Sequence, residues 1–447
     1  MTIPKSTEVV VVGAGCFGLS TAYHLLKRGF THVTVLDRSP ELPAPEAAST
    51  DINKIVRSSY ADPFYAGLAR DAIAAWKDTA EWGDTYHECA QSLHAFINGL
   101  DLHNVHRSGV LVLLEGSGSY ANKAFENDKA IGARTEILRD AEALRAAFPP
   151  GVEACSFEGR SGYINRDGGW AHATQGVKFA MNKVAELGGK VLSGKAVVEL
   201  LKEDGQTKGV RCGDGSVYPA GLVVLSAGSW SAASFPSLGL GEKCVATGQT
   251  VGKIQLTQEE ADIYRGNPVY LDLNTGFYVF PPNEQNVVKC AIHAAGYTHA
   301  TPATEHAPVS SPVFPQASGT DIGTLVPRAA LHELGDALRA VFPALARKPW
   351  CGTRLCWYTD SPDEDWVIGF HPADANIMLA TAGSGHGYKF LPVIGRLVAD
   401  AIEGTLPTEL VRKFALDRQK NEVPVSRPWS QIRNLDLADL VGPAAIV

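Results

Sequence analysis

The sequence of 447 residues contains no run of about 18 uninterrupted apolar residues, which a transmembrane helix requires. It also lacks a segment dominated by lysine and arginine. Its 40 basic and 48 acidic residues are spread along the chain and give a net charge of −8. Proteins that bind nucleic acid or anionic membranes usually present a basic face. We therefore expect neither kind of partner.

Pairs of the Cys-x-x-Cys type are also absent, so we expect no metal site of that kind and no disulfide framework. The amino terminus lacks the hydrophobic core of a signal peptide, and the carboxyl terminus is not a Ser-Lys-Leu peroxisomal address. These absences favour a reduced, cytoplasmic protein. The dispersed cysteines are Cys16, Cys89, Cys155, Cys212, Cys244, Cys290, Cys351 and Cys356.

Glycine, in contrast, is abundant: there are 44 glycines, where average usage of ~7% predicts about 31. Hydrophobic residues make up 45% of the chain, enough for a large core, which excludes a wholly disordered protein. Most glycines stand in short clusters at the ends of apolar runs. A backbone that approaches a ligand closely is a common reason for such clusters.

The first glycine cluster has the context of a dinucleotide-binding motif. A β-branched run at residues 8–12 precedes Gly13-Ala14-Gly15-Cys16-Phe17-Gly18, and a helical pattern follows over residues 19–27. A second apolar run at residues 33–36 ends in Asp37. This order of strand, glycine turn, helix, strand and acid predicts dinucleotide binding. The alternative is an ordinary strand–helix turn with coincidental glycines.

Each position of this motif has a physical role. Gly13 makes the turn, Gly15 lets the backbone approach a pyrophosphate, and Gly18 allows close packing of helix on strand. The helix N-terminus favours the phosphate through its dipole. Asp37 would accept hydrogen bonds from ribose hydroxyls.

A later segment favours FAD over NAD. Residues 222–225 have the pattern of a buried strand that ends in Ala227-Gly228-Ser229-Trp230, and a hairpin-like segment at 210–218 precedes it. In a two-part FAD domain, a strand that rejoins the sheet and ends in small residues closes the domain over the cofactor.

The middle of the chain has a different pattern. Alternating strand patterns at 250–256, 276–280 and 287–293 predict an antiparallel sheet. Helical patterns cover residues 65–82 and 174–187, and residues 299–327 are rich in proline, serine and threonine and are expected to form a long loop. The strand–glycine–helix pattern then returns over residues 377–403.

We therefore predict an α/β fold with an additional antiparallel sheet. A discontinuous, Rossmann-like FAD-binding domain would comprise residues 1–90, 151–235 and 350–405. An interleaved mixed α+β substrate domain would comprise residues 91–150 and 236–349, and residues 406–447 would form a C-terminal segment.

Several cations stand out in their local patterns. Lys289 interrupts an apolar strand, Lys54 and Arg57 lie three residues apart, and Lys389 follows the last glycine cluster. A lysine in an apolar strand needs a reason, because burying a charge is costly. Lys389 near a cofactor plane would attract an anionic substrate. The alternatives are an edge-strand lysine and solvated surface cations.

The chain resembles the monomeric sarcosine oxidase family of flavoproteins, especially its fungal amadoriase (fructosyl amino acid oxidase) and pipecolate oxidase branches. The resemblance covers nearly the whole chain. It rests on Gly13 to Gly18, Asp51 to Arg57, Gly168-Gly169-Trp170, Ala227 to Trp230, Arg354 to Asp360 and Ser384 to Phe390.

The resemblance implies roles for individual residues. Cys356 matches the cysteine that forms a thioether to the flavin 8-methyl carbon, and Lys289 matches the lysine that promotes reaction of reduced flavin with oxygen. Arg57 and Lys389 match the pair that binds the substrate α-carboxylate; an arginine fork reads a carboxylate bidentately. Lys54 would also face the site.

His293 and Tyr358 match positions that line the substrate cavity, although a lone histidine is more often structural. With Lys289 and Lys54 they complete the predicted catalytic set. The residues expected to contact FAD are Gly13, Gly15, Cys16, Phe17, Gly18, Asp37, Arg38, Ser49, Asn53, Lys54, Val197, Ala227, Gly228, Trp230, Cys356, Gly385, His386, Gly387, Tyr388 and Lys389.

One departure affects the expected substrate. Amadoriases carry Asp-Glu two residues after the equivalent of Lys289, whereas this chain has Ala291 and Ile292, whose side chains offer no hydrogen bonds to a sugar. The resemblance therefore implies a monomeric FAD oxidase of secondary-amine α-amino acids (pipecolate, saccharopine or N-methyl amino acid type) that reduces oxygen to hydrogen peroxide. A fructosyl amino acid oxidase and a flavin dehydrogenase with a non-oxygen acceptor remain alternatives. Peroxisomal location occurs in the family.

Overall fold

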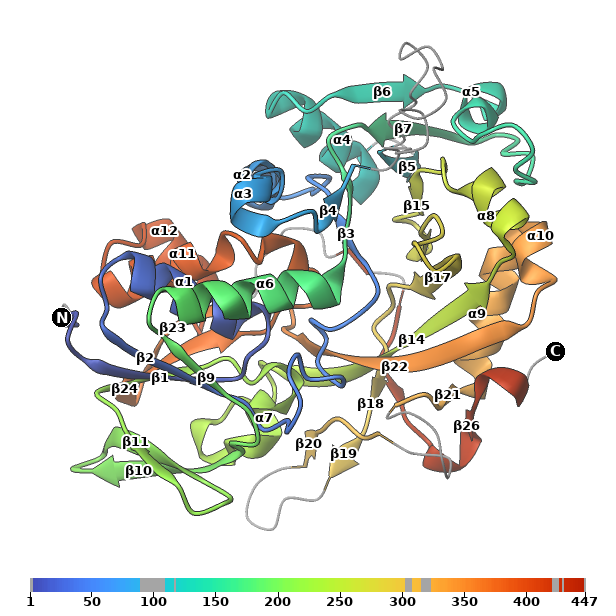
Figure 1. The fold of residues 1–447 in the computed structure, drawn as a ribbon. Helices are drawn as coiled ribbons and strands as arrows, with labels where there is room; N and C mark the ends of the chain where they lie inside the picture. The colour runs from blue at the N-terminus through green and yellow to red at the C-terminus, as the bar shows by residue number, and fades with distance from the viewer. Residues whose placement is uncertain are drawn as a thin grey trace.

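The computed structural model describes residues 3–88, 109–115, 118–301, 308–314, 323–419, 426–427 and 430–445. Two large sheets organise this part of the chain (Figure 1). Cys89 and much of the predicted loop at 299–327 lie outside the described residues. The fold is mixed α/β with several sheets, as predicted.

The first sheet has six strands, and all neighbours are parallel except one antiparallel pair at the edge. Its middle strands are runs of valine and leucine, as expected for strands buried on both faces. In spatial order the strands are β23 (Val367–His371), β24 (Asp374–Thr381), β13 (Leu222–Leu225), β1 (Glu8–Val12), β2 (His32–Leu36) and β9 (Lys190–Leu192).

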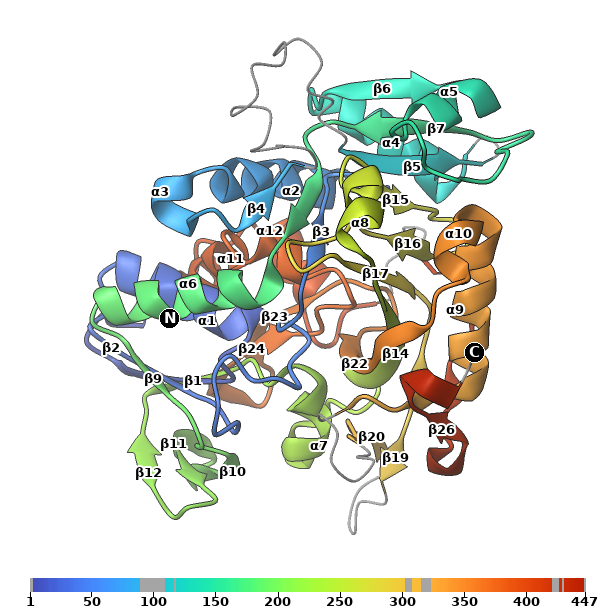
Figure 2. The same cartoon turned by 45° about the vertical axis from the view of Figure 1, so that its right-hand side comes forward.

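The two faces of this sheet are covered differently, because successive side chains of a strand point to opposite sides. Val9 and Val11 pack in a core with helices α1 (Cys16–Lys27), α6 (Ala173–Glu186) and α11 (Ile394–Glu403). Val10 and Val12 belong to the core on the other face. That face carries β10 (Val197–Glu203), β11 (Gln206–Cys212), β12 (Val217–Pro219) and α7 (Ser231–Ser234), as Figure 2 shows.

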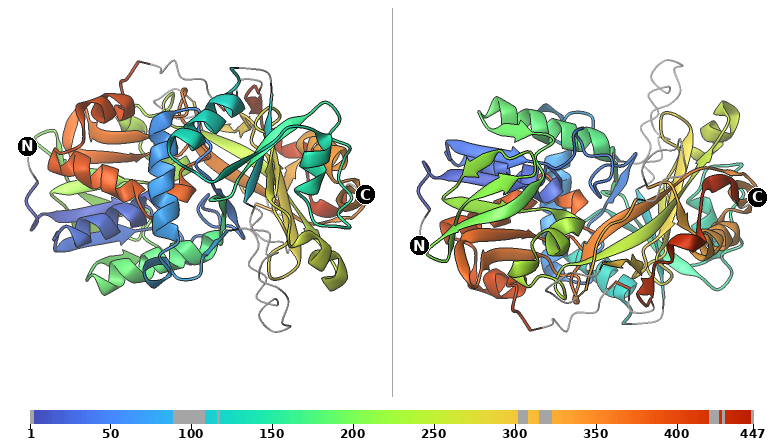
Figure 3. Two further views of the ribbon diagram at one scale, coloured as in Figure 1. Left: turned by 90° about the horizontal axis from the view of Figure 1, so that it is seen from above. Right: turned by 90° about the horizontal axis from the view of Figure 1, so that it is seen from below.

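The second sheet has ten strands and lies on the other side of the molecule (Figure 3). The predicted antiparallel pairing is confirmed: β14 pairs with β17, and β17 with β16. The path is β25 (Arg433–Asn434), β18 (Tyr297–Thr298), β14 (Val245–Gln255), β17 (Val287–Ile292), β16 (Phe277–Val279), β15 (Val269–Leu271), β5 (Val110–Leu114), β7 (Ser161–Asn165) and β6 (Thr135–Leu138), with β22 (Trp350–Asp360) paired to β14.

Smaller elements join and flank these sheets. β3 (Lys54–Val56), β8 (Gly169–Ala171) and β4 (Tyr86–His87) form a three-stranded sheet that leads from the first large sheet toward the second. The remaining described elements are α2 (Pro63–Trp76), α3 (Thr79–Trp82), α4 (Tyr120–Ala130), α5 (Ala141–Ala146), α8 (Gln258–Tyr264), α9 (Arg328–Val341), α10 (Pro343–Ala346), α12 (Thr408–Phe414), β19 (Ala300–Thr301), β20 (Val309–Ser310), β21 (Val326–Pro327), β26 (Leu440–Val441) and the short 3-10 turns η3 (Gly228–Trp230), η4 (Pro236–Leu238), η5 (Tyr388–Phe390), η6 (Leu437–Asp439) and η7 (Pro443–Ala445).

Two predicted helices differ in detail. The single helix expected over 65–82 is α2 followed by α3, because the Asp78 side chain accepts a hydrogen bond from Glu81 N and starts a new helix. The last glycine cluster leads into η5 rather than directly into a helix. Pro392 separates η5 from α11, since proline cannot donate the backbone hydrogen bond that would continue it.

Strand membership bears on the predicted domain boundaries. The predicted FAD-binding segments include residues 161–165 and 350–360, yet β7 and β22 hydrogen-bond within the ten-stranded sheet. β22 is long enough to run beside β14 through eleven residues and to end next to the first sheet. The boundaries themselves stay a prediction.

Candidate active site

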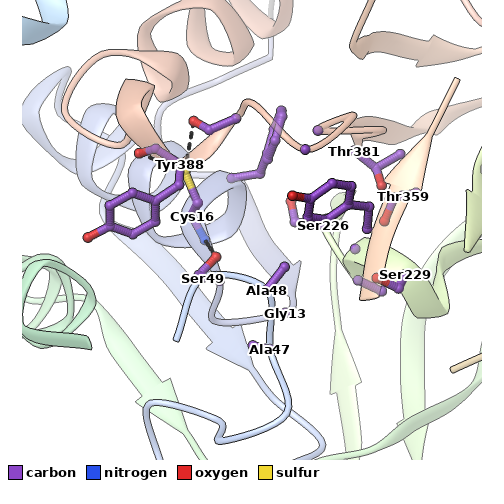
Figure 4. A pocket seen from close by; sticks show the side chains of 18 of the residues that line it. Gly13, Cys16, Ala47, Ala48, Ser49, Ser226, Ser229, Thr359, Thr381 and Tyr388 are labelled. Carbon is purple, nitrogen blue, oxygen red and sulfur yellow. Dashed lines mark hydrogen bonds between the residues drawn. The ribbon is translucent and has the colours of Figure 1, made fainter. Parts of the chain in front are cut away.

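A cavity of about 560 Å³ extends from the carboxyl ends of β1, β2, β13 and β24 to strands β16, β17 and β22. Figure 4 shows one part of it, where Gly13, Cys16 and Ser49 lie opposite Ser226, Thr359 and Thr381. The carboxyl ends of parallel strands at a reversal of strand order are the usual ligand site of such sheets. Both large sheets contribute to the lining.

The glycine turn after β1 is held by backbone contacts. Gly13 has a φ of +107°, and a Cβ there would meet Ser226 O at 2.5 Å. A Cβ on Gly18 would meet Gly13 O at 1.9 Å, so only glycine fits at both positions. Asp37 accepts hydrogen bonds from Ala14 N at 2.7 Å and Ser39 N at 2.9 Å and so fixes the end of β2 to the turn. Burial raises the pKa of the Asp37 carboxyl.

The start of α1 faces the cavity. Gly15 occupies the N-cap without a side-chain hydrogen bond, and Ser49 Oγ accepts one from Cys16 N at 2.9 Å (Figure 4). Free backbone N–H groups at a helix start favour an anion. Nearby, the Arg38 guanidinium lies 4.4 Å from the centroid of the Trp230 ring, and both side chains line the cavity.

Buried polar atoms without partners show that the site fits a large polar group. Both amide atoms of Asn53 and the hydroxyl of Ser226 are buried and have no hydrogen-bond partner among the described residues. Nearly all buried polar groups of native proteins are paired, so the Ser226 hydroxyl, which lines the cavity, is open to a ligand there, whereas Asn53 lies just behind the lining. A dinucleotide with a hydrogen-bonding ring system meets this requirement.

Asp51 joins two lysines below the cavity. Lys289 Nζ donates to Asp51 Oδ2 at 2.7 Å and to Asn53 O at 2.7 Å, and Lys54 Nζ lies 3.0 Å from the same carboxylate oxygen. Lys289 is 1% exposed. Burial lowers the pKa of Lys289 to about 8, although Asp51 opposes this shift. Burial of Asp51 is outweighed by Lys289 and Lys54, which hold the pKa of its carboxyl well below the usual range.

Cys356 lies on β22 directly opposite Gln249 of β14. Its Sγ is 4.0 Å from Lys54 Nζ, and its side chain packs with Val251, Ala291 and Tyr278. Cys356 is buried and does not itself line the cavity, whereas its neighbours Lys54 and Tyr278 do.

Arg57 and Lys389 share one neighbour, Tyr60. Lys389 Nζ donates to Tyr60 Oη at 2.8 Å and to His386 O at 2.9 Å, and the Arg57 guanidinium lies 4.7 Å from the Tyr60 ring centroid. Arg57 is 8% and Lys389 6% exposed. Burial, with the charge of Arg57, lowers the pKa of Lys389 well below its usual value.

No carboxylate pairs with Arg57 or Lys389 among the residues that the structure describes. The other buried cations near the cavity have such partners: Lys289 pairs with Asp51, and Arg427 pairs with Asp360 and Glu364. A buried cation without an anion is unfavourable unless a ligand completes the pair. The two cations therefore form a site for an anion.

The glycine cluster after β24 shapes the same end of the cavity. A Cβ on Gly385 would meet Tyr358 Cε2 at 2.4 Å and His293 Cε1 at 2.8 Å, so the chain passes directly against these rings. Tyr388 Oη donates to Ala173 O at 2.9 Å, which anchors the cluster to α6. Burial lowers the pKa values of His293 and His386, leaving both rings neutral at physiological pH.

The structure brings nearly all predicted site residues to this cavity. Gly18, Asn53 and Cys356 are the exceptions: each is buried just behind the lining. The cavity lining includes Gly13, Gly15, Cys16, Phe17, Asp37, Arg38, Ser49, Lys54, Arg57, Val197, Ala227, Gly228, Trp230, Lys289, His293, Tyr358, Gly385, His386, Gly387, Tyr388 and Lys389.

Sequence reasoning missed several residues of the site. Asp51 stands in the quoted motif but was given no role, and Tyr278 lines the cavity from β16. Ser426 reaches the cavity from the C-terminal segment and contacts His293. The spacing of Asp51 and Lys54 is no signal for their pairing, because i,i+3 pairs meet on a helix and residues 51–54 are not helical. Ser426 has no sequence signal, because its position depends on the tertiary fold.

No helix of the described residues is long and apolar enough to cross a membrane. Within the described ranges, no group of three or more histidine, cysteine, aspartate or glutamate side chains is arranged to hold a metal ion.

The sequence is similar to those of known oxidases. Residues 8–401 match the family of FAD-dependent oxidoreductases (DAO). L-saccharopine oxidase of Schizosaccharomyces pombe is 28% identical over 445 residues, which cover 96% of this chain and 97% of that protein. Human peroxisomal sarcosine oxidase is 25% identical over 419 residues, covering 92% and 96%.

Solved structures of oxidoreductases have a similar fold. Amadoriase I of Aspergillus fumigatus, a fructosyl amine:oxygen oxidoreductase, superposes with a TM-score of 0.80 at 28% identity, covering 99% of this chain and 98% of that one. The predicted resemblance to the sarcosine oxidase family is thus confirmed. Around one cavity lie a glycine turn, unpartnered polar groups and two neighbouring cations without an acidic partner among the described residues. The chain belongs to the family of FAD-dependent oxidoreductases and is an FAD-dependent enzyme.

Proposed function

We propose that the protein is an FAD-dependent oxidase of secondary-amine α-amino acids, of the pipecolate, saccharopine or N-methyl amino acid type. It would oxidise the C–N bond to an imine while oxygen is reduced to hydrogen peroxide. Water would then hydrolyse an open-chain imine, whereas a cyclic substrate would give a cyclic imine. The observation that carries this proposal is the pair of buried, anion-free cations Arg57 and Lys389 in the family's cofactor cavity.

These two cations suit an α-carboxylate. A guanidinium offers a planar fork of N–H donors and an ammonium adds a point charge, so together they hold one carboxylate in a fixed orientation. Lys389 Nζ uses two of its donors on Tyr60 Oη and His386 O, which leaves one for the substrate. A bound carboxylate would also offset the burial that lowers the pKa of Lys389.

The cofactor would lie along the cavity in a discontinuous, Rossmann-like FAD-binding domain. The turn at Gly13 and Gly15 and the start of α1 would hold the pyrophosphate, and Asp37 would accept from the ribose. Ser226 offers an unpaired hydroxyl at the cavity wall, and the unpaired amide of Asn53 lies just behind it. When bound, FAD accepts the hydride equivalent from the carbon next to the amine nitrogen and passes two electrons to oxygen.

Lys289 would support the reaction with oxygen. Its ammonium is buried, fixed by Asp51 and the Asn53 carbonyl, and 5.0 Å from the Phe280 ring centroid. A fixed cation in a dry site stabilises an anion that develops beside it, and oxygen becomes anionic as it accepts electrons. Lys289 therefore favours the oxidase over a dehydrogenase that uses another acceptor.

The lining near Lys289 favours an apolar substrate body. The cavity wall there consists of aliphatic and aromatic side chains, namely Ile55, Leu271, Leu273, Tyr278 and Phe280. Ala291 and Ile292 do not line the cavity, so the preference rests on this wall and not on the missing Asp-Glu pair. An apolar wall favours a cyclic or N-alkyl amino acid over a sugar adduct. Fructosyl amino acids remain the second candidate because amadoriases are among the similar solved structures.

A substrate panel tests the proposal. Purified protein would be assayed for hydrogen peroxide with sarcosine, L-pipecolate, saccharopine and fructosyl-lysine under air. Highest kcat/KM on one of the first three supports the proposal, and highest kcat/KM on fructosyl-lysine favours the amadoriase alternative. Flavin reduction by these amines without peroxide under air would indicate the dehydrogenase.

The flavin link is a further prediction. If Cys356 forms a thioether to the flavin, acid precipitation leaves the yellow colour with the protein, and Cys356→Ser releases it into the supernatant. Cys244→Ser is the matched control, since Cys244 is equally buried but lies in the core beneath the six-stranded sheet. Complete release of flavin from the unaltered protein would contradict the assignment.

We also propose that the protein acts as a monomer in the cytoplasm. The name of a similar bacterial enzyme, monomeric sarcosine oxidase of Arthrobacter, supports the first point, with 24% identity over 404 residues. The human relative is named as peroxisomal, so fractionation of cells is the measurement that decides the compartment.

A further inference from the structure

Glu364 stands at the centre of a hydrogen-bond network beside the cation pair. It follows β22 and has a left-handed backbone conformation with a φ of +62°, which residues other than glycine rarely adopt. Its carboxylate accepts from Ser426 N and Ser426 Oγ, both at 2.7 Å, and from Arg427 Nε at 2.9 Å. Strained residues that persist in a structure are often functional.

The Ser426 hydroxyl connects Glu364 to His293. Ser426 Oγ lies 3.2 Å from His293 Nε2. A hydroxyl has one hydrogen to donate, and a carboxylate that is paired with Arg427 can only accept. The hydroxyl must therefore donate to Glu364 and accept from His293, so the proton of the neutral ring sits on Nε2.

The other ring nitrogen is then an acceptor. His293 Nδ1 has no hydrogen-bond partner among the described residues, and His293 lines the cavity. Burial and the nearby cations Arg427 and Arg57 lower the pKa of this imidazole, which keeps the ring neutral.

The backbone carbonyl of the same residue orients the second site histidine. His386 Nε2 lies 2.9 Å from Glu364 O, and a carbonyl can only accept, so this nitrogen also carries its proton. His386 Nδ1 then accepts from Tyr60 Oη at 3.2 Å, and Tyr60 in turn accepts from Lys389. One residue thus sets the direction of the hydrogen bonds of both site histidines.

We infer that Glu364 is a positioning residue that acts through the Ser426 hydroxyl to fix the proton of His293 on Nε2 and leave Nδ1 as an acceptor at the cavity. Under the proposed function, on which only this last step rests, Nδ1 accepts the N–H of the substrate amine. A carboxylate clamp and a fixed acceptor would orient the carbon next to nitrogen.

The C-terminal segment contributes this device. Arg427 also pairs with Asp360, and its Nη1 donates to Ala294 O at 3.0 Å next to His293. These contacts hold Ser426 in place from a part of the chain that follows the six-stranded sheet and precedes β25 of the ten-stranded sheet. Ser430 lies nearby and accepts from Ala295 N at 2.8 Å, and no hydrogen bond joins its side chain to a histidine among the described residues, so it provides a matched control.

The experiment reads the tautomer directly in the resting holoprotein. Protein labelled with ¹⁵N-histidine would be studied by two-bond ¹H–¹⁵N NMR, with the His293 signals identified by their loss in His293→Gln. The expected spectrum has the proton on Nε2. Ser426→Ala and Glu364→Gln should give mixed tautomers, whereas Ser426→Thr and Ser430→Ala should keep the original one.

Kinetics supply a second readout. Loss of one oriented hydrogen bond should lower kcat/KM about tenfold in Ser426→Ala, with recovery in Ser426→Thr and no change in Ser430→Ala. A proton on Nδ1 in the unaltered protein would overturn the inference, and so would an unchanged tautomer in both Ser426→Ala and Glu364→Gln. If these variants do not fold, the spectrum of the unaltered protein decides. Because that spectrum needs no substrate, its outcome is independent of the proposed reaction.

Discussion

Replacing Lys289 with methionine should slow reoxidation of the reduced enzyme by oxygen by about 10²–10³-fold, the usual effect of removing one preorganised charge or donor. The ammonium is 1% exposed and is fixed by Asp51 and the Asn53 carbonyl, so it needs no reorganisation when charge develops. Methionine has a similar length without the charge. Stopped-flow mixing of the reduced enzyme with oxygen measures the rate.

The same experiment contains its own controls. Lys253 lies opposite Lys289 on β14 but does not line the cavity, so Lys253→Met should reoxidise at the original rate. Reduction by the amine should change less than reoxidation in Lys289→Met, since Lys289 is not part of the cation pair. An unchanged reoxidation rate in Lys289→Met would refute the oxygen role.

The rate of reoxidation should also depend on pH through the charge of Lys289. Burial lowers the pKa of Lys289 to about 8, so the side chain is charged below this pH and neutral above it. The reoxidation rate should therefore fall as the pH rises through about 8. In Lys289→Met this decline should be missing.

Replacing Arg57 with alanine should lower kcat/KM for an amino-acid substrate by about 10²–10³-fold, mainly through KM. Truncating one partner of a buried, hydrogen-bonded charge pair typically costs about 2–5 kcal/mol. Arg57 is buried and has no acidic partner among the described residues, so its charge is available to the substrate. Arg57→Lys should recover part of the loss, because an ammonium keeps the charge but not the planar fork.

A substrate without the negative charge makes this test specific. With the methyl ester of the same amino acid, Arg57→Ala and the unaltered enzyme should differ far less. Arg70 on α2 is exposed, and Arg70→Ala serves as the control for loss of an arginine. Equal losses with acid and ester would mean that Arg57 has a structural role only.

The first strand–turn–helix unit could be predicted because its signals are local. Gly13, Gly15, Gly18 and Asp37 stand within one short stretch, and the neighbouring strands are continuous apolar runs. The strand order could not be predicted in the same way. β13 pairs with β1, β24 with β13 and β9 with β2, and each of these pairs joins distant parts of the chain that no local pattern connects.

The residues of the candidate site could likewise be predicted only where they belong to a local motif. Residues within quoted motifs, such as Lys54, Arg57 and Lys389, reach the cavity. Glu364 and Ser426 were not predicted, because their contact joins positions 62 residues apart through a left-handed turn. The helix predicted over 65–82 was wrong at Asp78, where a side-chain cap outweighs the continuing helical pattern.

Anaerobic titration followed by admission of air tests the central claim most directly. Under argon, one equivalent of the best secondary-amine amino acid per flavin should bleach the oxidised flavin absorbance, and oxygen should then restore it with one equivalent of hydrogen peroxide. Failure of every amine in the panel to bleach the flavin would contradict the assignment as an amine oxidase. Bleaching that air does not reverse, or that yields no peroxide, would contradict the assignment of oxygen as the acceptor.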